Sequence, residues 1–198
     1  MAVKLPKVSR KTYTELRPLI QSGDIWLCSG NAPFSKLIQF ATGSPWSHVG
    51  FVMRLDSIDR VVVMESVESI GVRTVPTSQY VGGRDGKSEK YPGRLFLARH
   101  NKFNANNLDG LARFGRFAVD QLGSPYDNQE IARIAWRIAS RKKRDAKSNA
   151  DKSFICSEYA YECYKAVGVN IKLNDKGFIA PSDFPADPNV ELLYEIVL

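Results

Sequence analysis

Cys156 is the residue best placed in this sequence for nucleophilic chemistry. It lies in the run Ser-Phe-Ile-Cys-Ser-Glu at 153–158, near the start of an apolar helix predicted over 153–167. The free N–H groups and partial positive charge of a helix N-terminus favour a thiolate over a thiol. The same N–H groups can receive the oxyanion of an acyl-transfer transition state. The alternative is a small buried hydrophobic residue, which is the usual place of a free cysteine.

The other two cysteines lack this advantage. Cys163 lies seven residues further along the same predicted helix, and Cys28 lies within a predicted strand over 25–28, so we expect both to be structural. An odd number of cysteines does not make a disulfide framework, and these three lack the paired spacing of a zinc site. With two histidines in the chain, a multi-histidine metal site is excluded. The chemistry expected here requires neither a metal nor an organic cofactor.

A thiolate nucleophile needs a base, and His48 is the better placed of the two histidines. It opens a predicted strand after a tight turn at 43–45, where a side chain can face a cleft. Gly50 lies on the same face and leaves space above the sheet for another backbone or for substrate. His100 follows Arg99 in a charged stretch, so we predict a surface position for it. The alternative for His48 is a structural histidine on a strand.

Glu65 is the candidate for the residue that orients His48. The β-rich runs at 47–55 and 60–67 predict a hairpin around 56–59, in which the numbers of paired residues sum to 115. Glu65 would then face Gly50, diagonal to His48 and within reach of its ring. It could accept an N–H from the imidazole, as the third member of a catalytic triad does. The alternative is a carboxylate at the sheet rim that contacts solvent or an arginine.

The remaining elements would have to position these three side chains. The pattern predicts helices over 9–21 (capped by Ser9), 33–41, 107–122 and 128–140, strands over 25–28, 71–75, 94–99 and 192–197, and a surface loop over 82–93. The 107–122 helix would turn Leu108, Leu111, Phe114, Ala118 and Leu122 inward. Because helical and strand-rich regions are separate, the fold class is α+β. We expect a single domain over 1–198, with 1–21 as an N-terminal helical extension.

Composition places the chain among ordinary globular proteins with a basic excess. The sequence has 198 residues, with 28 Lys and Arg against 21 Asp and Glu, a net charge of +7. No apolar run is long enough to span a bilayer, and no signal peptide is seen, so a cytoplasmic protein without a transmembrane segment is expected.

Much of the positive charge lies in a basic segment at 137–152. Its ordinary interpretation is a solvated helix end and loop. The alternative is a face that binds anionic surfaces such as phospholipid, anionic polymer or nucleic acid. It carries no specific nucleic-acid motif, because aromatic residues that could stack on bases are nearly absent from it.

Six segments together resemble one known family in their order and spacing. They are Gly23-Asp24-Ile25, the run from Thr42 to Gly50 around His48, Met64-Glu65-Ser66, the run from Gly123 to Asp127, the run from Phe154 to Glu158 around Cys156, and the run from Ala180 to Phe184. The family is the circularly permuted papain-like branch of the NlpC-type cysteine hydrolases. This branch includes the YiiX/YaeF-like proteins and is related to lecithin:retinol acyltransferase-like enzymes. The resemblance spans roughly residues 22–185.

The resemblance implies both a fold and a set of roles. The fold would be a permuted papain-like one, in which a central antiparallel sheet packs against the cysteine-bearing helix. Cys156 would be the nucleophile, His48 the base and Glu65 the orienting residue. Three further residues have two interpretations each. Tyr126 could line the cleft, help to hold the oxyanion or pack at a helix start. Asp24 could lie beside the site or cap a turn, and Trp46 could form a pocket wall or fill the core.

The leading functional hypothesis is therefore a cysteine hydrolase, a thiol protease, amidase or acyl-ester hydrolase that works through an acyl-enzyme on Cys156. The substrates implied by the resemblance are small amides, cell-wall-type peptides and acyl-lipid esters. One alternative is an acyltransferase that uses the same thioester. The other is a catalytically silent module that binds anionic surfaces through the basic segment 137–152.

Overall fold

A twisted, mostly antiparallel sheet is the frame of the protein in the computed structural model, which describes residues 4–82, 89–127, 153–173 and 178–198. Among these residues the sheet has seven strands in the order β1-β7-β6-β2-β3-β4-β5. Only the β1–β7 pair is parallel. The strands are β1 (Ser9–Thr12), β2 (Ile25–Gly30), β3 (His48–Leu55), β4 (Arg60–Val67), β5 (Gly71–Pro76), β6 (Gly93–His100) and β7 (Val190–Val197).

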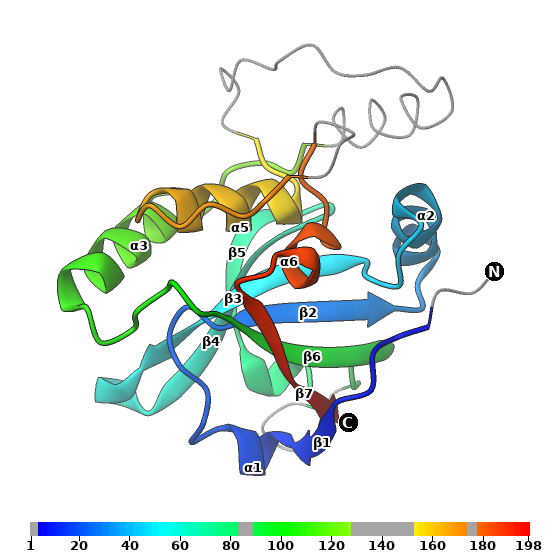
Figure 1. Cartoon of the computed structure of the whole chain (residues 1–198), viewed down its shortest axis with the longest axis horizontal. Coiled ribbons are helices and arrows are strands. Elements are labelled where there is room, and N and C mark those ends of the chain that lie inside the picture. Colours follow the sequence, from blue (N-terminus) through cyan, green and yellow to red (C-terminus); the bar gives the residue numbers. More distant parts are fainter. Residues whose placement is uncertain (1–3, 83–88, 128–152, 174–177) are drawn as a thin grey trace.

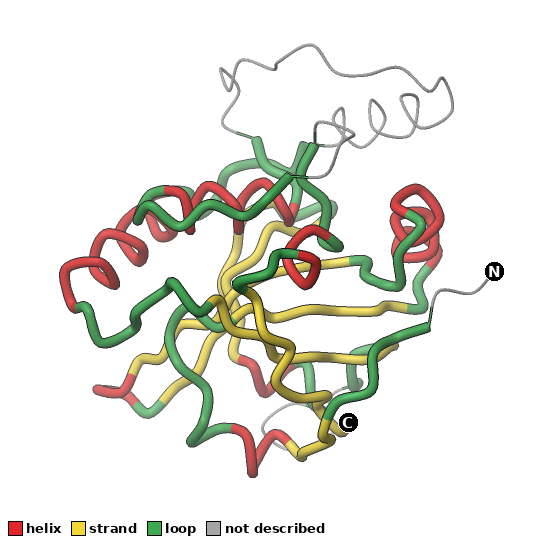
Figure 2. The backbone as a smooth tube through the Cα atoms, in the orientation of Figure 1, coloured by secondary structure: helices red, strands yellow, loops and turns green. Residues whose placement is uncertain are grey.

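Two of the longer helices, α3 (Leu108–Asp120) and α5 (Cys156–Lys165), lie together on one side of this sheet (Figure 1). Figure 2 shows the same division, with the helices in red beside the strands in yellow. The helices are α1 (Tyr13–Leu16), α2 (Pro33–Thr42), α3 (Leu108–Asp120), α5 (Cys156–Lys165) and α6 (Asp183–Ala186), and two short 3-10 turns span Asp56–Ile58 and Thr77–Gln79. The arrangement is the α+β class expected from the sequence.

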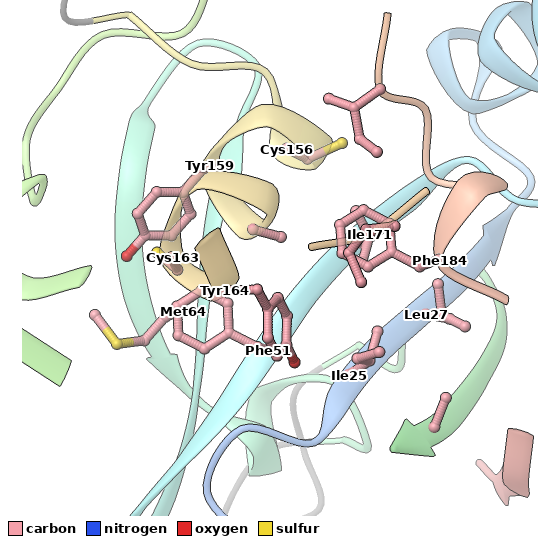
Figure 3. Packing of buried hydrophobic residues seen from close by; sticks show 14 of the residues in the cluster. Ile25, Leu27, Phe51, Met64, Cys156, Tyr159, Cys163, Tyr164, Ile171 and Phe184 are labelled. Atoms are coloured by element: carbon pink, nitrogen blue, oxygen red, sulfur yellow. The ribbon is translucent and has the colours of Figure 1, made fainter. Parts of the chain in front are cut away.

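Aromatic packing fixes α5 against the sheet. Tyr159, Cys163 and Tyr164 are fully buried and lie on the side of the helix that faces Phe51 of β3 (Figure 3). The rings of Phe51 and Tyr159 have their centroids 5.5 Å apart. Large aromatic side chains bury much apolar surface, so these contacts hold α5 firmly against the sheet. Cys156, the first residue of α5, is thereby held in a fixed position above the sheet.

The β3–β4 hairpin has the predicted register. Leu55 pairs with Arg60, and Phe51 pairs with Met64, so paired numbers sum to 115. At Gly50 an added Cβ would lie 2.8 Å from the carbonyl oxygen of Met64 and 3.2 Å from Cβ of Glu65. The space that Gly50 provides is therefore occupied by the backbone of β4.

The predicted N-terminal helix over 9–21 is wrong for most of its length. Ser9–Thr12 forms β1, which pairs with β7, and helical structure is confined to Tyr13–Leu16. Thr12 rather than Ser9 caps this helix, through reciprocal hydrogen bonds with Glu15. Tertiary pairing with the C-terminal strand has overridden the local helical pattern.

Two predictions of burial are also wrong. His100 is fully buried instead of exposed, because it ends β6, a strand with neighbours on both sides, and stacks on Tyr164. On α3, Phe114 and Ala118 point inward as predicted, but Leu108 at 78% and Leu122 at 40% exposure do not. Both leucines lie at or beyond the ends of the helix, where the sheet no longer covers it.

Several predictions fall on residues outside the described part of the chain. They are the helix over 128–140, the basic segment 137–152 and the centre of the loop over 82–93. Within the described residues, no helix combines the length and apolar character required to cross a membrane.

Gly71 is expected to be the least replaceable glycine of the sheet. It has a φ of +87°, and an added Cβ would lie 2.1 Å from the carbonyl oxygen of Ser124. Gly123 has a similar φ of +81° but open space around it. Gly123→Ala should therefore cost only the left-handed strain, roughly 1–2 kcal/mol. Gly71→Ala should cost a further 1–3 kcal/mol or so from the clash.

Urea unfolding of the two variants, at matched pH, measures this difference. If Gly71→Ala and Gly123→Ala lost the same unfolding free energy, β5 would not lie as close to the loop after α3 as the structure places it.

Candidate active site

Cys156 is the first residue of α5, and its position is tied to β4. Ser66, next to Glu65 on β4, donates its hydroxyl proton to the carbonyl oxygen of Phe154 at 2.7 Å. The N–H of Ile155 is bound by the carboxylate of Glu158 at 3.3 Å. The first N–H groups of a helix have no partners within the helix. At the start of α5 these groups belong to Cys156 and the residues that follow it.

His48 lies between Cys156 and Glu65. Its Nε2 is 2.6 Å from Oε2 of Glu65, and the ring also interacts with the side chain of Cys156. The His48 side chain is only 16% exposed. Because Nε2 is used by the carboxylate, Nδ1 is the ring nitrogen left for the sulfur. The structure thus brings the three predicted side chains together in the order cysteine, histidine, glutamate.

Glu65 is completely buried and has three side-chain partners. Besides His48, the Arg73 guanidinium donates to Oε1 at 3.0 Å from Nε, and the Tyr80 hydroxyl donates to Oε2. Burial opposes ionisation of the carboxyl. The hydrogen bond and charge of His48, the Tyr80 hydroxyl and the charge of Arg73 outweigh burial and lower the pKa of Glu65 below its ordinary value of 4.5. Glu65 is therefore a permanent anion at neutral pH.

The pKa of His48 is shifted in the opposite direction. Burial alone would lower it, but the negative charge and hydrogen bond of Cys156, followed by those of Glu65, raise it from 6.5 to about 10. At neutral pH the ring is consequently an imidazolium, held by the Glu65 carboxylate and next to the side chain of Cys156. The site holds a proton on His48 that can be given to a departing group.

Two cavities open beside the sulfur of Cys156. The larger has a volume of about 410 Å³ and is lined by His48 and by charged side chains that include Arg73 and Lys90. The smaller has a volume of about 40 Å³ and lies between α2, the start of α5 and residues 178–181. Cys156 lines both, so its side chain can be approached from either cavity.

Of the three further candidates from the sequence, Tyr126 lies at the site, whereas Asp24 and Trp46 do not. Tyr126 lines both cavities, with its ring 6.4 Å from that of Phe34. Asp24 lies elsewhere, where it binds the Arg99 guanidinium at 2.6 Å and caps a turn at the N–H of Gln21. Trp46 fills the core edge-on to Phe96 and lines neither cavity.

Sequence reasoning missed the residues that support the triad. Arg73 lies directly opposite Glu65 in the β4–β5 pairing. A predicted register for these two strands would have identified it. Tyr80 follows a 3-10 turn, and Ser66 bonds to a backbone carbonyl 88 residues away. Neither contact has a signal in the local sequence.

Comparisons with known proteins identify a solved structure with a similar fold. Neither the models of protein families nor the curated proteins contain a match to the sequence. A solved structure described as the metalloprotein yiiX from Escherichia coli O157:H7, DUF1105, superimposes with a TM-score of 0.63 at 20% sequence identity. The match covers 88% of this chain and 96% of the other. The chain therefore has the fold of that protein.

The protonation state of His48 should respond to its two partners. Cys156→Ala removes the first of the influences that raise the pKa of His48 to about 10, and Glu65→Gln removes another, so His48 should titrate lower in each variant than in the intact site. NMR of the imidazole carbons as a function of pH follows the change. His100, whose pKa burial lowers from 6.5, is an internal reference. An intact His48 that titrates at 6.5, or one that Cys156→Ala leaves unmoved, would contradict the arrangement.

The hydroxyl of Tyr80 should stabilise the fold more than that of another buried tyrosine. Tyr80 donates to an ionised carboxylate, whereas Tyr159 donates to the carbonyl oxygen of Ala118 at 2.9 Å. Tyr80→Phe should cost roughly 1.5–3 kcal/mol, and the matched control Tyr159→Phe about 1 kcal/mol.

Because the pKa of Glu65 is lowered, its stabilising bonds are complete above 4.5 and are lost as the pH falls through the folded value below that. The gap between the two variants in urea unfolding should therefore narrow in acid. A gap that is absent at pH 7 would show that Tyr80 does not bind a charged group.

Proposed function

We propose that this protein is a cysteine hydrolase that cleaves an amide or ester bond through an acyl-enzyme on Cys156. The observation that carries the proposal is the buried row of Cys156, His48 and Glu65 at the mouth of two cavities. A fully buried carboxylate bound by three donors is costly to assemble, because each charge must be taken out of water. Such a cost is typical of functional sites.

The proposed reaction begins from the thiolate–imidazolium pair. The Cys156 sulfur attacks the carbonyl carbon, and its electron pair forms the new C–S bond. As the tetrahedral intermediate collapses, the bond to the leaving nitrogen or oxygen breaks, and His48 gives that atom its proton. His48, now neutral, takes a proton from water as the water attacks the thioester. The thiolate is expelled and the ion pair is restored.

The helix N-terminus supports the charge that develops during this reaction. The backbone N–H groups at the start of α5 lie beside Cys156 and have no partners within the helix. They can donate to the oxyanion of the tetrahedral intermediate. Tyr126, which lines both cavities, forms a wall beside the same position. Glu65 holds the tautomer and orientation of the His48 ring throughout.

The chain order of the site supports a place for this protein in the permuted papain-like branch of the NlpC-type hydrolases. In the sequence the histidine comes first, the acidic residue second and the cysteine last, and the cysteine starts a helix that packs on an antiparallel sheet. The fold is shared with yiiX, whose description as a metalloprotein raises the question of a metal here. Among the described residues, no group of three or more His, Cys, Asp or Glu side chains is arranged to hold a metal ion. The proposed reaction is written with the side chains of this chain alone.

The nucleophile is tested by replacing each of two buried cysteines. Cys156→Ala should lower turnover of p-nitrophenyl esters by at least about 1,000-fold, since it removes the covalent step. Cys163→Ala, seven residues further along α5 and in the core, is the matched control and should keep most of the activity. Mass spectrometry of the quenched protein should find the acyl group on the peptide that carries Cys156. Turnover retained in Cys156→Ala, or acylation of another residue, would overturn the proposal.

A further inference from the structure

The two cavities at Cys156 differ in their contact with His48. The larger cavity is lined by both Cys156 and His48. The smaller one is lined by Cys156 but not by His48. Since both cavities share the nucleophile, the position of the histidine distinguishes one side of the scissile bond from the other.

The histidine decides which part of a substrate lies in which cavity, and this step rests on the proposed function. A general acid must lie next to the atom that it protonates, which is the leaving nitrogen or oxygen. The leaving group therefore occupies the larger cavity, on the His48 side. The acyl group stays bonded to the sulfur after cleavage and extends to the other side, into the smaller cavity.

The smaller cavity has the chemistry of a site for an apolar group. Among the described residues that line it none is charged, and most are apolar: Leu37, Ile38, Ala41, Ile155, Phe178, Ile179, Ala180 and Pro181. The hydroxyls of Thr42 and Ser157 in the wall already donate to backbone carbonyls, at 2.9 Å each. A polar or ionic acyl group would lose its water there without gaining matching partners.

The larger cavity has the opposite character. Glu68, Arg73, Glu89 and Lys90 line it together with serine and tyrosine hydroxyls. It suits a polar alcohol or amine as the leaving group. The Arg73 guanidinium is already bound to Glu65, so among the described residues Glu68, Glu89 and Lys90 are the charged groups left for a substrate.

The volume of the smaller cavity limits the length of the acyl chain. One water-sized group needs about 10–15 Å³ of such volume. The cavity holds about 40 Å³, which is room for a few chain atoms beyond the carbonyl carbon. We propose that the substrates are esters or amides of a short, unbranched apolar acid, about four to six carbons long, with a polar alcohol or amine as leaving group.

The test varies the acyl chain while the leaving group stays constant. With p-nitrophenyl acetate, butyrate, hexanoate and decanoate, kcat/KM should rise by about 10-fold from acetate to butyrate as two methylenes are buried. It should then fall by decanoate, which exceeds the cavity. A steady decline from acetate, or a continuous rise to decanoate, would overturn the assignment.

Two variants of α2 locate the effect in the cavity. Ala41→Trp fills the smaller cavity from its α2 wall and should lower the butyrate-to-acetate ratio by about 10-fold, to near one. Lys36→Trp is the matched control, because Lys36 is exposed on the same helix and lines neither cavity. It should leave the ratio unchanged. Equal ratios in Ala41→Trp and the unmodified protein would contradict the proposal.

A second reagent separates this assignment from the proposed function. Alkyl methanethiosulfonates transfer an S-alkyl group to a thiolate and release methanesulfinate, so they need no hydrolysis. The butyl reagent should modify Cys156 faster than the methyl reagent, and Ala41→Trp should remove that preference. If esters are inert but this preference is present, the hydrolase function is wrong and the apolar cavity is supported. If esters turn over without chain-length selection, the function stands and the cavity assignment is wrong.

Discussion

The buried carboxylate of Glu65 is the constraint on which the rest of the site depends. A charge without solvent must be matched by donors, and here His48, Arg73 and Tyr80 supply them. Loss of one partner leaves an uncompensated charge, which is far more costly than loss of an exposed ion pair. The same bonds that keep Glu65 ionised also fix the His48 ring, so the stability of the fold and the geometry of the site have one origin.

The fold brings the cysteine to this carboxylate from the other end of the chain. Glu65 and His48 come from neighbouring strands of one hairpin, whereas Cys156 starts a helix about 90 residues later in the sequence. The helix is fixed at its buried side by Phe51 and at its start by the bond from Ser66 to Phe154. Both attachments are on β3 and β4, the strands that carry the other two triad members. The distance between sulfur and imidazole is thus set by one rigid unit.

Local patterns were sufficient to predict the parts of this unit that depend on local structure. The β3–β4 register placed Glu65 next to His48, and the helix-start pattern placed Cys156 at the N-terminus of α5. What could not be predicted depends on long-range pairing. Residues 9–12 became a strand because β7 was there to pair with it, and His100 became buried because α5 covers the end of β6. The contact between Tyr80 and Glu65 likewise has no local signature.

The central claim is that Cys156 and His48 form a reactive ion pair. Alkylation of each cysteine by iodoacetamide between about pH 5 and 9, followed by peptide mass spectrometry, measures this directly. All three cysteines are buried, but Cys156 lines both cavities. At pH 6 it should react much faster than Cys28 and Cys163, and His48→Ala should remove that advantage. A Cys156 that is as inert as the other two, or equally reactive without His48, would contradict the account.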